Sequence, residues 1–164
     1  MVISLKLLVM SDSHQNIERM RYAARQTSPD AILHLGDHIS DAQKLSRQLP
    51  NSVIYMVKGN CDFQTKGQDE LFLIQGNVKI LMTHGHTYGV KRGLADLIER
   101  ARQLGADLAL YGHTHRAALR QENGLWLMCP GQMERHDDGL MASYGVVAIE
   151  DGSFVCGIEM LPRL

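Results

Sequence analysis

The sequence of 164 residues has few of the features that mark secreted or membrane proteins. It contains only three cysteines, which are odd in number and too widely spaced for a C-x-x-C pair: Cys61, Cys129 and Cys156. This pattern argues against a disulfide scaffold and favours a reducing compartment, so we expect a cytoplasmic protein. The apolar N-terminal run is short, Lys6 interrupts it, and no small-residue cleavage site follows, which argues against a signal peptide.

The sequence also has no excess of one charge and few aromatic residues. Its 17 basic and 18 acidic residues give a formal net charge of -1, and aromatic residues make up 5% of the chain. Proteins that bind extended nucleic acid or an anionic membrane surface usually carry a basic face, in the first case studded with aromatic side chains. No hydrophobic run is long enough to cross a bilayer. We therefore expect neither extended nucleic acid nor a membrane as a partner.

Short apolar runs alternate with amphipathic segments in the first third of the chain. Strands are predicted at 2–10, 31–35 and 53–57, and helices at 17–26 and 40–49. Ser40 is the predicted N-cap of the second helix. The alternation predicts parallel strands joined by right-handed crossovers. A hydrophobic content of 45% at this length suits one core, so we expect a single domain over residues 1–164.

The rest of the chain is richer in hairpins. Pairs of strand-like runs flank short turns at 71–84, 117–129 and 144–160. A buried strand is predicted at 107–111, and a helix from Lys91 to Leu104 that ends before Gly105. The expected fold is therefore α/β, with a parallel half, a hairpin-rich half and helices on the outside.

Polar side chains that can bind a metal follow five of the predicted strands. They are Asp12 and His14, Asp37, Asn60, His84, and His113 and His115. Ligands bind at the carboxyl edge of parallel α/β sheets, so we expect these distant residues to converge there. Carboxylate, imidazole and amide groups suit divalent Mn, Fe, Zn, Co or Ni. The set contains no cysteine, which argues against a structural thiolate zinc site.

The number of candidate ligands indicates two ions rather than one. Two ions about 3.5–4 Å apart need a bridging carboxylate and a bridging water or hydroxide. Asp37, which stands alone after a glycine, is the natural bridge. Taken singly, each motif has a structural interpretation, because GD and GN are common turn dipeptides and Asp12 or Asn60 could cap a turn. The ordered combination favours the metal site.

The motifs SDSH, GD, GNCD, THGH and GHTH, in this order, resemble the motif series of the calcineurin-like metallophosphoesterases. The resemblance covers about residues 7–131, and the short length and the GNCD variant are similar to the YfcE-type phosphodiesterases. It implies a four-layer αββα sandwich of mixed sheets flanked by helices. It also implies two sets of metal ligands, which share Asp37. The first comprises Asp12, His14, Asp37 and His115, and the second comprises Asp37, Asn60, His84 and His113.

The activity implied by the resemblance is hydrolysis of a small phosphodiester by a metal-bridging hydroxide. Two divalent ions are expected, Mn in the first place, with Zn, Fe, Ni, Co or Mg as alternatives. Many relatives carry a histidine, thought to help protonate the leaving group, where this chain has Cys61. A neutral thiol is a poor acid, which favours diesters with acidic leaving groups. The catalytic candidates are Asp37, Asn60 and His86; His86 could contact phosphate, donate a proton or serve a structural role.

An alternative function is a metal-binding scaffold with the same fold and little catalysis. A eukaryotic retromer subunit that resembles this family acts mainly through protein interactions, but scaffold-type relatives tend to lose a histidine ligand, and all of these positions are intact here. An exposed edge strand could also support a homo-oligomer. The polar segment 131–143 could cover the pocket, with Arg135 and His136 as substrate-contact candidates. His34 is predicted to be a buried, hydrogen-bonded histidine, and Asp62 to orient a ligand or cap a turn.

Overall fold

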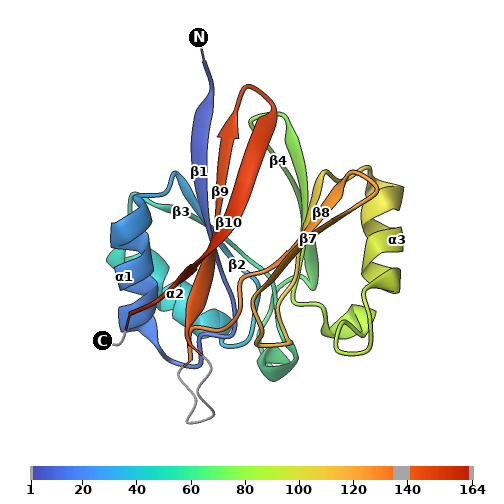
Figure 1. Ribbon diagram of the computed structural model, residues 1–164. Helices are drawn as coiled ribbons and strands as arrows, with labels where there is room; N and C mark the ends of the chain where they lie inside the picture. The colour runs from blue at the N-terminus through green and yellow to red at the C-terminus, as the bar shows by residue number, and fades with distance from the viewer. Residues whose placement is uncertain (1, 135–140, 163–164) are drawn as a thin grey trace.

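Two sheets of five strands lie face to face, with helices on their outer sides (Figure 1). The structure is a computed structural model that describes residues 2–134 and 141–162. Helices α1 (Ile17–Thr27) and α2 (Ile39–Gln48) cover the outside of the first sheet, and α3 (Ala95–Leu104) covers the outside of the second. The predicted four-layer αββα sandwich is therefore confirmed.

The first sheet has the order β10-β9-β1-β2-β3. Its strands are β1 (Ser4–Met10), β2 (Ala31–His34), β3 (Val53–Met56), β9 (Ser143–Glu150) and β10 (Ser153–Met160). The first three run parallel, as the alternating sequence predicts. Strand β9 pairs antiparallel with the free side of β1, and β10 pairs antiparallel with β9. The carboxyl ends of β1 and β2 consequently lie next to each other near the centre of the sheet.

The second sheet has the order β4-β5-β6-β8-β7. Its strands are β4 (Glu70–Gln75), β5 (Val78–Thr83), β6 (Leu108–Leu110), β7 (Ala118–Glu122) and β8 (Leu125–Cys129). Strands β5, β6 and β8 are parallel, and the hairpin partners β4 and β7 are antiparallel edges. The carboxyl ends of β5 and β6 therefore also lie side by side. Two short 3₁₀ helices follow β3 and β5, at η1 (Asn60–Asp62) and η2 (His86–Tyr88).

The main core lies between the two sheets. Because side chains alternate along a strand, Leu7 and Val9 of β1 face this core, whereas Leu8 and Met10 pack under the helices. All four are completely buried. Burying each such side chain contributes about 1.5–3 kcal/mol, so β1 is a rigid support for the loop that follows it. Within the described residues, no helix is long and apolar enough to span a membrane.

The predicted starts of two helices are wrong. Helix α2 begins at Ile39 rather than after Ser40, and its N-cap position is His38, whose side chain makes no capping bond. The carboxylate of Asp62 supplies the cap instead, because it accepts a hydrogen bond from the Ile39 N–H at 2.9 Å. Helix α3 begins at Ala95 rather than Lys91, because residues 89–92 form a turn closed by a backbone hydrogen bond.

Candidate metal centre

The loops after β1, β2, β3, β5 and β6 meet at one end of the sandwich, at the bottom of Figure 1. Backbone hydrogen bonds join them: the Asp12 N–H donates to the Gly36 carbonyl at 3.0 Å, and the Gly112 N–H donates to the His84 carbonyl at 2.9 Å. The strand ends of each sheet are thus tied together directly beneath the polar side chains that follow them.

The structure brings four of the predicted ligands into one compact group. Ligand atoms of Asp12, His14, Asp37 and His115 all lie within 4.8 Å of one another. His115 Nε2 is 3.0 Å from Asp12 Oδ1. Asp12 and Asp37 are almost completely buried, with exposed fractions of 0% and 2%. Two buried carboxylates at this separation need positive charge between them.

The other three predicted ligands adjoin this group. His84 Nε2 lies 3.0 Å from Asn60 Oδ1 and 3.5 Å from Asp37 Oδ1. The rings of His84 and His113 have their centroids 5.1 Å apart. Asp37 therefore contacts both groups, which is the position that a bridging ligand would need. The seven side chains form one continuous cluster, which we call the donor cage: Asp12, His14, Asp37, Asn60, His84, His113 and His115.

The backbone is unusual at most cage residues. Five of the seven have positive φ angles: Asp12 (53°), His14 (42°), Asp37 (56°), His113 (70°) and His115 (62°). A left-handed conformation at a non-glycine residue costs on the order of 1 kcal/mol and persists only where the surroundings impose it. Such outliers concentrate at functional sites because they aim side chains that a regular strand end would point elsewhere.

Glycine is required beside the cage because the backbones approach so closely. A Cβ atom at Gly59 would clash with the Asp37 carboxylate, and one at Gly112 would clash with Ser11 Oγ. The GN and GH dipeptides, which are only turn signals when read alone, therefore have a packing role here.

The charges within the cage balance one another. Burial opposes the charged form of both carboxylates, but His115 and His84 keep the pKa of Asp12 lowered, and His84 and the Cys61 N–H hold the pKa of Asp37 well below its usual range. Conversely, Asp12 raises the pKa of His115, and Asp37 and Asp12 outweigh burial to raise the pKa of His84. A metal cation in the cage would supply the positive charge that these carboxylates need.

The residues present fit divalent cations. His14 Nε2 is buried and has no hydrogen-bond partner within the described chain, although a polar atom in such a position normally has one. His84 donates from Nδ1 to the Leu35 carbonyl at 2.8 Å, which leaves Nε2 facing the cage. This is how proteins usually orient a metal-binding histidine. Burial and the neighbouring His84 lower the pKa of His113 to about 4, so its ring is neutral and able to bind metal at neutral pH.

The other predicted residues have more varied positions. Cys61 is exposed, but partial desolvation of its thiol and the neighbouring Asp37 carboxylate raise the pKa of the thiol to about 11. Asp62 caps the turn, since its carboxylate accepts the N–H groups of Gly59 and Ile39. His86 lies beside the cage, with its ring centroid 5.4 Å from that of His84. Burial and His84 lower the pKa of His86, which makes it a hydrogen-bonding group rather than a ready acid.

Residues 131–134, the described start of the predicted segment 131–143, contact the loop that follows β1. Met133 is completely buried, and its N–H donates to the Asp12 carbonyl at 3.3 Å. Glu134 follows, with Oε2 3.9 Å from His14 Nε2. The predicted contact residues Arg135 and His136 lie outside the described residues.

Sequence reasoning missed three residues around the cage: Ser13, Asp41 and Glu134. The first two belong to a buried hydrogen-bond network beneath the cage. Asp41 carries a detectable signal, because it is an acidic residue on the buried face of α2, together with Ile39, Ala42 and Leu45. Ser13 stands between two predicted ligands, so in the sequence it looks like an ordinary loop residue. Glu134 stands in a segment without a recognisable pattern.

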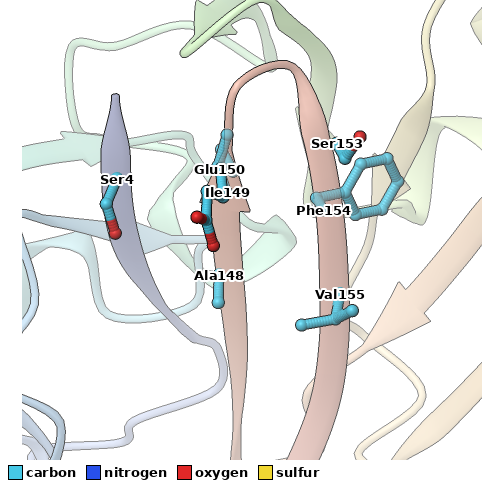
Figure 2. A pocket seen from close by; sticks show the side chains of 7 residues that line it. All are labelled: Ser4, Ala148, Ile149, Glu150, Ser153, Phe154 and Val155. Carbon is cyan, nitrogen blue, oxygen red and sulfur yellow. The ribbon is translucent and has the colours of Figure 1, made fainter. Parts of the chain in front are cut away.

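A second concavity lies at the opposite end of the sandwich and has different chemistry. This shallow pocket of about 240 Å³ is formed by the start of β1 and by the β9–β10 hairpin (Figure 2). Its lining comprises Ser4, Ala148, Ile149, Glu150, Ser153, Phe154 and Val155. Glu150 is the sole ionisable side chain in this lining, so the donor cage is the better candidate for chemistry.

Carboxylates, an amide and imidazoles gathered at the strand ends of a four-layer sandwich are the kind of donor set that divalent-metal proteins use. The chain belongs to the calcineurin-like phosphoesterase superfamily, whose domain model matches residues 5–152.

Two curated relatives match most of the chain. It is 35% identical over 150 residues to the probable metallophosphoesterase YsnB of Bacillus subtilis, covering 90% of this chain and 86% of YsnB. It is 25% identical to the phosphodiesterase YfcE of Escherichia coli strain K12, covering 96% of this chain and all of YfcE. The predicted membership of a family with YfcE-type relatives is thereby confirmed.

Solved structures agree with this fold. A predicted phosphoesterase from Streptococcus pneumoniae superposes with a TM-score of 0.79 at 26% identity, covering 96% of this chain and 90% of that one. Vps29 from Entamoeba histolytica, crystallised in complex with Zn²⁺, superposes with a TM-score of 0.70 at 22% identity, covering 95% and 99% of the respective chains. The second likeness shows a shared fold alone.

Proposed function

We propose that the protein is a phosphodiesterase that hydrolyses a small phosphodiester with the help of two divalent cations. The first cation would be held by Asp12, His14, Asp37 and His115. The second would be held by Asp37, Asn60, His84 and His113. The observation that carries the proposal is the proximity of Asp37 to both groups, with Oδ1 3.5 Å from His84 Nε2 and its carboxylate within 4.8 Å of the other first-group ligands. We propose Mn²⁺ as the preferred ion, with Zn²⁺, Fe²⁺, Ni²⁺, Co²⁺ and Mg²⁺ as alternatives.

When bound, the two cations supply a nucleophile at neutral pH and positive charge that stabilises the phosphoryl group in the transition state. The residues of the chain orient this chemistry. The Cys61 N–H donates to Asp37 Oδ1 at 3.0 Å and so holds the shared carboxylate in one rotamer. The Leu35 carbonyl fixes the ring of His84 in the same way.

A preference for diesters with an acidic leaving group is supported by the lack of a strong acid among the nearby candidates. The pKa of the Cys61 thiol, raised to about 11 by burial and by Asp37, makes it a weak proton donor to a departing alkoxide. His86, with its lowered pKa, is neutral at pH 7 and is proposed to hydrogen-bond a phosphate oxygen. A leaving group such as a nitrophenol needs no proton from the protein.

The alternative is a metal-binding scaffold, which is suggested by the shared fold with Vps29. The complete set of donors supports catalysis over this alternative, because a scaffold has no need to keep every ligand of a reactive centre. The two functions predict the same metal content and differ in turnover.

The test measures hydrolysis of bis-p-nitrophenyl phosphate by the metal-free protein reconstituted with each cation, alongside metal content by elemental analysis. We expect turnover that requires Mn²⁺ or a similar ion and that is abolished by Asp37→Ala and by His84→Ala. Stoichiometric metal without turnover on a panel of mono- and diesters would favour the scaffold. Wild-type rates in both variants would refute the site.

A further inference from the structure

Three polar side chains beneath the donor cage have no part in the proposed chemistry. Ser13, His34 and Asp41 are each completely buried, with exposed fractions of 0%. Ser13 lies between the cage residues Asp12 and His14, and His34 ends β2 just before Asp37. Burying three polar groups is costly unless they are hydrogen-bonded, so their mutual contacts need an explanation.

The contacts define a hydrogen-bonded chain with one direction. The Gly36 N–H donates to His34 Nδ1 at 3.2 Å, so Nδ1 is an acceptor and a neutral ring carries its proton on Nε2. Nε2–H can then donate to Ser13 Oγ, 3.0 Å away. The Ser13 hydroxyl donates in turn to Asp41 Oδ2 at 2.8 Å. Burial lowers the pKa of His34 to about 4, which agrees with the neutral ring that this chain of bonds requires.

Both ends of this network hold the segments that carry the ligands of the first cation. Asp41 Oδ2 also accepts the Gln15 N–H at 2.7 Å. The network is therefore hydrogen-bonded to Ser13 and Gln15, the residues on either side of His14. His14 and Gln15 have φ angles of 42° and 69°, and this run of left-handed backbone needs an external restraint. At the other end, the bond from Gly36 to His34 restrains the residue next to Asp37, whose φ is 56°.

We propose that Ser13, His34 and Asp41 are positioning residues that hold the backbone of Asp12, His14 and Asp37 ready for the first cation. This role rests on the proposed metal site, and it explains how the ligands of that site are held in place before the cation binds. Ligands that are already in place lose less conformational freedom on binding, and outer partners of metal ligands typically contribute about 10–100-fold in affinity.

The experiment titrates the full-length, metal-free protein with Mn²⁺ by isothermal calorimetry and follows thermal unfolding in parallel. Ser13→Ala removes the central hydroxyl, and Ser13→Thr restores it. Thr27→Ala is the matched control, because it removes another buried hydroxyl, which donates to the Ala23 carbonyl at 2.8 Å in α1. The first cation, whose ligands the network restrains, is expected to give the tighter of the two binding events. Ser13→Ala should weaken this event by about 10–100-fold, Ser13→Thr should recover most of that loss, and Thr27→Ala should lower Tm without changing affinity.

A second measurement remains decisive if Ser13→Ala does not fold. Nitrogen-15 NMR of labelled histidines should show His34 as the neutral tautomer protonated on Nε2, and Asp41→Ala, which removes the acceptor of the bonds from Ser13 and Gln15, should weaken the tighter event while the protein stays folded. Affinity equal to wild type in folded Ser13→Ala or Asp41→Ala, or equal weakening by Thr27→Ala, would overturn the proposal. Wild-type protein that binds Mn²⁺ but hydrolyses no ester would overturn the phosphodiesterase function and leave the positioning role intact.

Discussion

The two halves of the donor cage are held in different ways. In the first half, Asp12, His14, Asp37 and His115 all have left-handed backbone, and the buried network of Ser13, His34 and Asp41 lies beneath them. This half grows mainly from β1 and β2, in the most deeply packed part of the first sheet.

The second half is more open. Asn60 is exposed and stands at the start of the short 3₁₀ helix η1. His113 is half-buried, as are His14 and His115 of the first half, so the difference in exposure comes from Asn60. His84 is the exception, since it is completely buried and is anchored to the Leu35 carbonyl. Ligands whose backbone is restrained by a buried network bind a cation more tightly than ligands without such a restraint, because less order must be created on binding. The first half should therefore fill first, and the second should exchange its ion more readily.

Removing the residue common to both halves should have the largest effect. We expect Asp37→Ala to abolish both binding events and to reduce turnover by about 10³-fold or more, because it removes the charge stabilisation contributed by both cations. Calorimetry with Mn²⁺ and a phosphodiester assay on the same sample would test this. Retention of one full binding event would mean that Asp37 is not shared.

Separate substitutions should then distinguish the halves. Asn60→Ala is expected to remove only the weaker binding event, leave about one ion per chain, and lower turnover by about 10²-fold. His14→Ala should instead weaken the tighter event. Elemental analysis after gel filtration would measure the metal ions retained per chain in both variants. The same loss of metal in each would argue that the two halves bind as a single unit.

The buried ring of His34, beneath the first half of the cage, should make the free energy of unfolding sensitive to mild acid. The pKa of His34 is lowered from 6.5 to about 4 by burial. Well above pH 6.5 the ring is neutral in both the folded and the unfolded chain, so its titration does not change stability. As the pH falls from 6.5 to about 4, the unfolded chain gains a proton that the folded chain does not accept, and the free energy of unfolding falls by up to about 3 kcal/mol.

Urea unfolding of metal-free wild type and of His34→Gln at a series of pH values would isolate this contribution. The variant lacks the titrating ring, so the difference between the two proteins should change steadily between pH 6.5 and 4. A constant difference over this range would mean that His34 is protonated in the folded state.

The smallest effect is expected at the edge of the first half. Glu134 Oε2 lies 3.9 Å from His14 Nε2, and its side chain is 30% exposed. Glu134→Gln keeps the shape and removes the negative charge, so it should weaken the tighter event by about fivefold or less, as expected for a partly solvated charge. Calorimetry would measure the change. A loss as large as that of His14→Ala would identify Glu134 as a ligand.

The predictable part of the site follows from local rules. Each cage residue stands within a few positions of the end of an apolar run, and strand ends in parallel sheets converge, so Asp12, Asp37 and His84 could be assigned to one place before any contact was known. The first residues of the helices were harder to predict from the sequence. The cap of α2 comes from Asp62, which lies 23 residues from Ile39 and belongs to a different turn.

The sequence by itself determined the order of the elements, the α/β class and the chemical types of the donors, because strand and helix periodicity and turn residues act over a few positions. The four-layer arrangement was expected only from the resemblance to a known family. Only the tertiary structure decided how these donors are supported. Ser13 meets Asp41 across 28 residues because β1 pairs with β2 and α2 returns over the same sheet. No short pattern encodes such a contact. The difference between a restrained first half and an open second half therefore arises when the two sheets and their helices pack together.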